Sequence, residues 1–312
     1  MMMTSRRNFL KTSVIAGVLP GFLNIHEEDL EQSKTSECNY KASEDISVGV
    51  IAHANNPEDD LKVVRDMGFS VCQLHIKEYS PELARRLVGT LDQYRIRPCS
   101  LICMGPGKYA WNFTDGPSTI GLIPRETREA RITRLKQGID FCKAAGIPAV
   151  HAHFGFIPKN PQDILYSEFI AIMKNLGEYG LKQGIDLYFE TGQETPITLL
   201  RTIEDVGTGN LFVNCDLANL VMYGKSNPLD GLRVLSKYVK ALHAKDGTYP
   251  TDPYRLGKEM PIPEGTVDFP KVIEFLKRIN FKGDVIIECE LSAVKTDYII
   301  HTKKYLERLI LS

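Results

Sequence analysis

A regular alternation of short apolar segments with longer amphipathic ones runs from Ile46 to the C-terminus and limits the folds open to this chain. Eight segments rich in Val, Ile, Leu, Phe or Cys are typical of buried parallel strands: residues 47–52, 70–76, 97–104, 149–154, 186–190, 211–216, 240–244 and 284–290. Helical spacing of apolar side chains marks residues 57–67, 81–94, 125–145, 162–183 and 269–279.

Eight strands, each followed by a helix, predict a (β/α)8 TIM barrel, a fold that typically needs ~250 residues. The chain has 312 residues, so residues 46–312 suffice for one catalytic barrel domain. The competing architecture is a doubly wound open sheet, but no Gly-rich phosphate-binding fingerprint follows the first strand. In a barrel, the chemistry is expected at the C-terminal ends of the strands.

The first 24 residues have a different character. A paired arginine within SRRNFLK (residues 5–11) precedes a mildly apolar stretch, which is the pattern of a twin-arginine export signal. A basic amphipathic helix is the alternative. Residues 25–45 are polar and predict a linker. No Cys follows the apolar stretch and no apolar run reaches ~18 residues, so we expect a periplasmic or otherwise exported protein without a membrane anchor.

Polar residues stand at the ends of four successive predicted strands: Glu190, Asp216, His243 and Glu288. One carboxylate after a strand is usually a helix cap or an ion-pair partner. Three carboxylates at one barrel mouth would repel one another and lose solvation, unless a cation joined them. Three oxygen ligands and one nitrogen suit Mn²⁺ best, with Mg²⁺, Co²⁺, Fe²⁺ or Zn²⁺ as alternatives. Glu290 is the alternative to Glu288, because it lies on the same side of the strand.

The chain resembles the sugar phosphate isomerase/epimerase family of the xylose-isomerase-like barrel superfamily. The motifs that carry the resemblance are FETGQE (189–194), DLANL (216–220), LHAKDG (242–247), EGTVDF (264–269) and IECE (287–290). In the ketose 3-epimerases of that superfamily, a Glu, Asp, His, Glu set binds the metal and the two Glu are the acid/base residues. The resemblance therefore implies metal ligands at Glu190, Asp216, His243 and Glu288, with catalytic roles for Glu190 and Glu288. Those epimerases have a substrate-binding His where this chain has Asn219.

A metal-dependent site of this kind predicts a sugar isomerase or epimerase that removes a proton next to a carbonyl and passes through an ene-diolate. If a leaving group stands beta to the carbonyl, the same chemistry makes the enzyme a 3-keto-glycoside lyase or hydratase, which is the main alternative. The export signal favours a free sugar, keto-sugar or glycoside over a sugar phosphate. Which sugar reacts, and in what oligomeric state, stays open.

Two other function classes are less favoured. An endonuclease-IV-like nuclease is disfavoured by the export signal, by Asn219 and by the formal net charge of -1, which provides no basic field for nucleic acid. A non-catalytic sugar-binding protein would not need all four ligand types.

Further side chains near the predicted strand ends are candidates for substrate binding. Lys245 follows the metal-site His, His75 ends the second strand, and His153 lies on the fourth strand, on the same face as His151. The long segment 105–121 carries Trp111, which could stack on a sugar. Together with Asn219, these residues make up the predicted substrate site.

Overall fold

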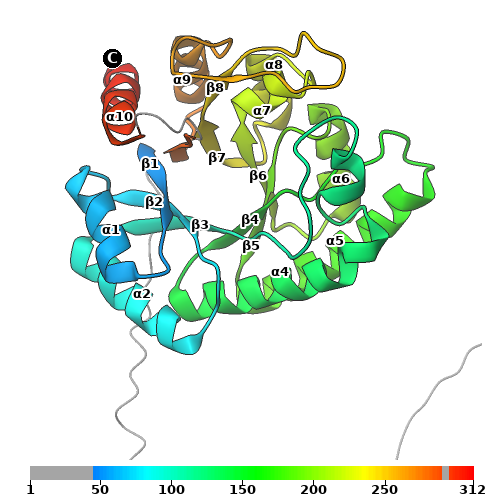
Figure 1. Cartoon of the computed structure of the whole chain (residues 1–312), viewed down its shortest axis with the longest axis horizontal. Coiled ribbons are helices and arrows are strands. Elements are labelled where there is room, and N and C mark those ends of the chain that lie inside the picture. Colours follow the sequence, from blue (N-terminus) through cyan, green and yellow to red (C-terminus); the bar gives the residue numbers. More distant parts are fainter. Residues whose placement is uncertain (1–44, 290–294) are drawn as a thin grey trace, which may run out of the picture. The chain divides into compact units, whose positions relative to one another are not determined.

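The computed structural model describes residues 45–289 and 295–312 (Figure 1). The predicted export signal, all but the last residue of the predicted linker, and Glu290 lie outside these residues. None of the described helices is long and apolar enough to cross a membrane.

Eight parallel strands close into a barrel in the order β1-β10-β7-β6-β5-β4-β3-β2, which confirms the predicted (β/α)8 fold. The barrel strands are β1 (Ile46–His53), β2 (Val71–His75), β3 (Arg97–Ile102), β4 (Ala149–Ala152), β5 (Asp186–Glu190), β6 (Leu211–Asp216), β7 (Val239–Ala244) and β10 (Gly283–Ile287).

Helices follow the strands and cover the outside of the barrel (Figure 1). They are α1 (Pro57–Asp66), α2 (Pro81–Tyr94), α3 (Gly116–Thr119), α4 (Arg125–Ala145), α5 (Ile164–Gln183), α6 (Pro196–Val206), α7 (Leu217–Met222), α8 (Pro228–Leu235), α9 (Phe269–Arg278) and α10 (Lys295–Leu311). Several begin with Pro in the first turn, where the missing N–H costs nothing, and α4, α5 and α6 end at a left-handed glycine.

A small two-stranded sheet, β8 (Asp246–Gly247) with β9 (Glu259–Met260), lies outside the barrel and was not predicted. Its chain segments are held by Asp246, which is fully buried and accepts hydrogen bonds from the backbone N–H groups of Gly247, Gly265 and Val267. A Cβ at position 265 would lie 2.1 Å from Asp246 Oδ1, so only glycine allows this approach. This loop organisation depends on contacts distant in sequence, which strand periodicity does not reveal.

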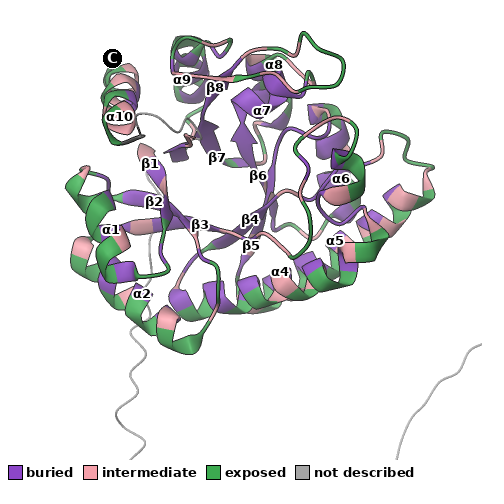
Figure 2. Cartoon of the chain, in the orientation of Figure 1, coloured by how far each residue is buried: buried purple, intermediate pink, exposed green. Residues whose placement is uncertain are grey.

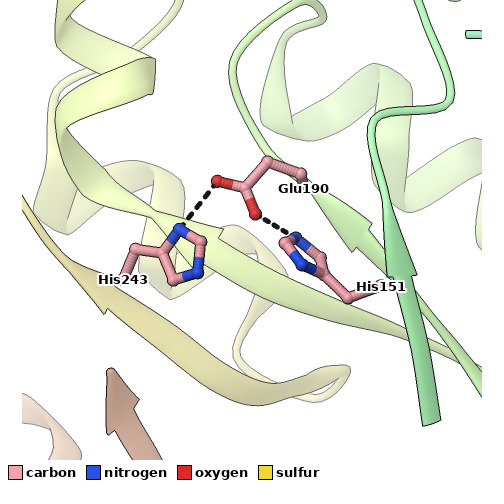
Figure 3. Close-up of side chains that lie close together, drawn as sticks. All are labelled: His151, Glu190 and His243. Carbon is pink, nitrogen blue, oxygen red and sulfur yellow. Dashed lines mark hydrogen bonds and ion pairs between the residues drawn. The ribbon is translucent and has the colours of Figure 1, made fainter. Parts of the chain in front are cut away.

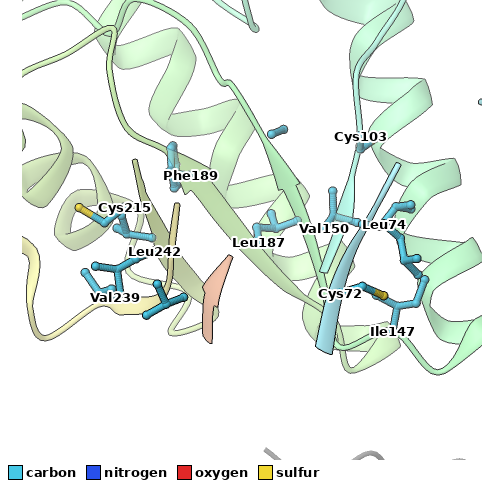
Figure 4. Close-up of a cluster of buried hydrophobic side chains, with 14 of the residues drawn as sticks. Cys72, Leu74, Cys103, Ile147, Val150, Leu187, Phe189, Cys215, Val239 and Leu242 are labelled. Carbon is cyan, nitrogen blue, oxygen red and sulfur yellow. The ribbon is translucent and has the colours of Figure 1, made fainter. Parts of the chain in front are cut away.

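The main hydrophobic core lies between the strands and the helices. Figure 2 shows the strands buried and the helices exposed on their outer faces, and Figure 4 shows core side chains such as Val150, Leu187 and Leu242. Complete burial of one such side chain is worth ~1.5–3 kcal/mol. The buried cysteines Cys72, Cys103, Cys142 and Cys215 belong to this core as small apolar groups.

The other strand face points into the barrel and is divided along its length. Val71, Cys99, Ala241 and Ile286 form a small apolar cluster. Because side chains two residues apart on a strand share one face, the positions that follow these on the inner face include Gln73, His243 and Glu288. The barrel interior is therefore apolar in one layer and polar in the layer nearer the C-terminal strand ends.

Candidate metal centre

Four adjacent strands of the barrel deliver the predicted ligands. Glu190 and Asp216 are the last residues of β5 and β6, His243 lies near the end of β7, and Glu288 directly follows β10. Ligand atoms of the four side chains lie within 4.8 Å of one another. The structure thus brings together the set that the sequence analysis selected, at the end of the barrel where the chemistry was expected.

His243 stands at the centre of the cluster. Its Nδ1 lies 2.7 Å from Glu288 Oε2, 3.0 Å from Glu190 Oε1 and 3.6 Å from Asp216 Oδ2. Its other nitrogen, Nε2, lies 2.8 Å from Gln73 Oε1, and the Gln73 amide in turn donates to Ser100 Oγ. An amide oxygen only accepts, so Nε2 carries a hydrogen and Nδ1 is the nitrogen available to a cation.

Glu190 is held from both sides. Its Oε2 accepts a hydrogen bond from Asn214 Nδ2 at 2.8 Å and makes a close contact with Nε2 of His151, while Oε1 faces His243 (Figure 3). Burial by itself raises the pKa of Glu190, but the imidazoles of His243 and His151 together lower this pKa well below its ordinary value. Glu190 is therefore ionised at neutral pH, with one oxygen fixed and the other directed at the cluster.

Asp216 combines two roles that the sequence analysis treated as alternatives. Its Oδ1 caps α7 by accepting a hydrogen bond of 2.7 Å from the backbone N–H of Asn219, and Oδ2 points toward the cluster. Burial raises the pKa of Asp216 to about 7, and the cation of Lys245 opposes that rise. The Lys245 ammonium lies 3.9 Å from Asp216 and 3.4 Å from Glu288.

The cluster meets a direct test of whether it fits a metal ion. With its hydrogen on Nε2, His243 cannot donate from Nδ1 to Glu288 Oε2 despite their close approach. Within the described part of the chain, Asp216 Oδ2, His243 Nδ1 and Glu288 Oε2 are therefore buried without a hydrogen bond. Leaving one such atom unsatisfied costs ~1–3 kcal/mol. All three come from side chains whose other polar atoms are engaged elsewhere or face the same space. A divalent cation with oxygen and imidazole ligands would satisfy them together, so the residues fit such an ion.

The predicted substrate residues lie around this cluster. Asn219 donates a hydrogen bond of 3.3 Å to Glu190 Oε1, and Lys245 pairs with Glu288. His153 Nδ1 lies 3.3 Å from Gln193 Oε1, and its ring is 4.8 Å from the ring of Trp111. His75 instead faces His53 across β1 and β2, with their Nδ1 atoms 3.1 Å apart.

The predicted site left out three residues that contact the cluster: Gln73, His151 and Asn214. Each lies on an inner strand face, and each is polar within an apolar strand. Asn214 could have been found by counting two residues back from Asp216 along the same strand face, and His151 was placed on the face of His153 but given no role. Of the two histidines on that face, the sequence analysis chose His153, whereas His151 is the one that contacts Glu190.

Comparison with known proteins identifies the family of the fold. Residues 61–309 match the family model described as xylose isomerase-like TIM barrel. A xylose isomerase domain protein from Planctomyces limnophilus is 27% identical, with a TM-score of 0.80 over 84% of this chain and 96% of that one.

Two more distant structures share the fold. A D-tagatose 3-epimerase-like protein is 17% identical, with a TM-score of 0.66 over 85% of this chain and 97% of its own. A xylose isomerase-like TIM barrel protein from Mycobacterium smegmatis, solved in complex with magnesium, is 18% identical, with a TM-score of 0.59 over 80% of this chain and 86% of its own.

Proposed function

Because the chain belongs to the xylose isomerase-like TIM barrel family, we propose that it is a divalent-metal-dependent enzyme that isomerises or epimerises a sugar. The observation that carries the proposal is the convergence of Glu190, Asp216, His243 and Glu288 on one point with three unsatisfied buried ligand atoms. Structures that share the fold include a D-tagatose 3-epimerase-like protein and a magnesium complex, which support a sugar substrate and a divalent ion.

The four side chains would hold the ion, with Mn²⁺ as the first choice for three oxygen ligands and one imidazole. A bound divalent ion supplies Lewis-acid polarisation of a carbonyl oxygen, which acidifies the neighbouring C–H. The protein supplies the rest of the site. Gln73 fixes the tautomer of His243, and Asn214 with His151 fixes the carboxylate of Glu190.

Two glutamates are placed to move the proton. Glu190 and Glu288 lie at the two ends of the arc of strands β5, β6, β7 and β10, and this separation along the barrel supports an approach to a substrate from different sides. Burial by itself would raise the pKa of Glu288, but the Lys245 ammonium and the contact with His243 together lower it, so both glutamates are ionised. Removal by one and return by the other inverts a carbon, while return to the neighbouring carbon isomerises the sugar.

The N-terminal sequence suggests where the reaction takes place. The paired arginine at residues 6–7 supports export through the twin-arginine route into the periplasm or beyond. Outside the cytoplasm, an unphosphorylated sugar is the more accessible substrate class.

Proton exchange tests the proposal directly. The Mn²⁺-loaded protein is incubated in D₂O with free, phosphorylated and 3-keto sugars, and deuterium at the carbon next to the carbonyl is followed by NMR. We expect incorporation that falls roughly 10²–10⁴-fold in Glu190→Gln and Glu288→Gln. Glu82→Gln, an exposed position on α2, is the control that should behave as wild type. Absence of exchange with every sugar and every divalent metal would overturn the proposal.

A further inference from the structure

Two groups of aromatic side chains lie near the candidate metal centre, Trp111 with Tyr109 and Tyr223 with Phe113 and Phe156, and together we call them the wall. Trp111 and Phe113 come from the segment between β3 and α4, and Phe156 comes from the loop after β4. The ring of Tyr223, just after α7, lies 6.3 Å from Phe113 and 6.0 Å from Phe156. Trp111 is 46% exposed, so its indole is open to a ligand even though its neighbours are partly buried.

The segment that carries Trp111 is held in one conformation by Arg131 of α4. This arginine is 2% exposed, and it donates hydrogen bonds to the carbonyl oxygens of Gly121 (2.7 Å), Pro106 (3.1 Å) and Lys108 (3.2 Å). Its guanidinium also lies 4.4 Å from the ring centre of Tyr109, which stacks on Trp111. A surface fixed in this way binds a ligand without first paying for its own ordering.

Two buried polar atoms next to this wall lack hydrogen bonds. Gln193 Nε2 and the Tyr223 hydroxyl make no hydrogen bond of ordinary length among the described residues, although their side chains are only 2% and 4% exposed. The two groups face each other: burial raises the pKa of Tyr223, and the neighbouring Gln193 amide opposes that rise. They lie together because Gly192 lets the β5–α6 loop approach α7. A Cβ at position 192 would lie 2.9 Å from Asn219 and 3.3 Å from the Tyr223 ring. Buried donors that the protein leaves unpaired are suited to a ligand that brings its own oxygen atoms.

The wall and the unpaired donors continue outward from the metal centre. His151 contacts Glu190, the ring of His153 lies 6.5 Å from that of His151, and Trp111 lies 4.8 Å beyond His153. Gln193 joins the same path, because its Oε1 lies 3.3 Å from His153. These contacts connect the four-residue cluster to Trp111 through His151 and His153.

We propose that Trp111, His153, Gln193 and Tyr223 form a second sugar-binding subsite, and that the substrate is a glycoside with a second ring rather than a single free monosaccharide. A pyranose has one apolar face of C–H groups, which packs on an exposed indole, and hydroxyls at its edge, which pair with the amide and the phenol. The part of this inference that concerns the substrate rests on the proposed function. The existence of the subsite does not.

Trp111 is the only tryptophan of the 312 residues, so tryptophan fluorescence reports on this subsite alone. The full-length protein is titrated with cellobiose, maltose, lactose, trehalose and sucrose, and with glucose as the one-ring comparison, both in EDTA and in Mn²⁺. We expect at least one disaccharide to change the emission saturably and to bind about tenfold more tightly than glucose, with or without metal. Gln193→Ala and Tyr223→Phe should weaken that binding roughly three- to tenfold by removing one hydrogen bond.

The control is Tyr254→Ala, which removes an aromatic side chain that is 71% exposed and is not one of the proposed subsite residues. Thermal unfolding of each variant separates loss of binding from loss of fold. If disaccharides bind but no sugar exchanges a proton, the subsite stands and the proposed reaction fails. If no disaccharide binds, if glucose binds equally well, or if both variants bind like wild type, the subsite is wrong even when turnover is observed.

Discussion

Replacement of Glu190 by glutamine tests the metal centre at its best-defined ligand. Glutamine keeps the size of the side chain but exchanges one carboxylate oxygen for an N–H₂ group. Two groups, His151 Nε2 and the Asn214 amide, face Oε2, whereas Oε1 lies 3.0 Å from His243 Nδ1. The amide oxygen should therefore take the place of Oε2, and the N–H₂ group should point into the cation site. We expect the variant to fold and to bind divalent cations poorly.

The expected magnitude follows from linkage. At a Mn²⁺ concentration about 100 times the Kd, binding stabilises the folded protein by ~2.7 kcal/mol. Loss of a residue that merely supports a ligand weakens metal binding by roughly 10–100-fold, so loss of a ligand should reach at least about 100-fold. At the same Mn²⁺ concentration, the metal would then stabilise Glu190→Gln by only ~0.4 kcal/mol.

The assay is urea denaturation in EDTA and in Mn²⁺, which gives the metal-dependent part of the unfolding free energy. Glu194→Gln is the matched control, because Glu194 is 5% exposed, as buried as Glu190 at 3%, and lies outside the four-residue cluster. Burial raises the pKa of Glu194 to about 8, so its carboxyl is largely protonated at pH 7 and glutamine imitates it closely. The reasoning is refuted if Mn²⁺ stabilises Glu190→Gln as much as wild type, or if both variants lose the effect equally.

Three further predictions concern other parts of the chain. Between the ordinary pKa of 4.5 and the raised pKa of about 8, Glu194 binds more protons in the folded protein than in the unfolded chain, so the unfolding free energy falls as pH rises through that window. Glu194→Gln should reduce this fall, measured by urea denaturation in EDTA at several pH values. An unchanged dependence of the unfolding free energy on pH would contradict the prediction. Arg131→Lys keeps the positive charge but cannot donate to all three loop carbonyls. It should cost roughly 2–4 kcal/mol of stability and weaken the sugar-induced fluorescence change, while Mn²⁺ affinity is preserved. Loss of Mn²⁺ affinity as well would show that the loop and the metal centre are not independent. Arg6→Lys combined with Arg7→Lys should leave the protein in the cytoplasm on cell fractionation, and normal export would show that the arginine pair was misinterpreted.

The barrel and its four-residue cluster were predictable from local sequence because both follow from strand periodicity. A strand that ends in a carboxylate or an imidazole delivers that group to the C-terminal end of any parallel barrel, whatever its neighbours are. The four candidate ligands could therefore be selected once the strands were assigned correctly. Asp216 shows that a strand-end carboxylate can be a helix cap and a candidate metal ligand at once, because Oδ1 accepts the capping hydrogen bond and Oδ2 faces His243.

The roles of His151 and Arg131 could not be predicted in this way, because they depend on the exact end of a strand and on contacts with a loop distant in sequence. The fourth strand was predicted to run to residue 154, but β4 ends at Ala152, and Gly155 turns the chain with a φ of 107°. His151 thus remains on the strand beside Glu190, and His153 lies beyond it. The burial of Arg131 was not predicted either, since a charged residue in a helical pattern normally indicates a solvent-exposed face. Its burial is possible only because three loop carbonyls surround it.

The way the two candidate sites are supported has a consequence for specificity. The four residues of the candidate metal centre are fixed by the barrel itself, through inner-face partners such as Gln73 and Asn214 whose positions are set by strand register. The aromatic wall is fixed by Arg131 and by loop contacts, which make no demand on that register. A change in the 105–121 segment can therefore alter which group is bound beside the reacting sugar while the geometry of the four-residue cluster stays the same. If both proposals hold, substrate specificity can change without a change in metal binding. Substitutions at Trp111 should therefore weaken binding of the second ring more than they weaken metal affinity.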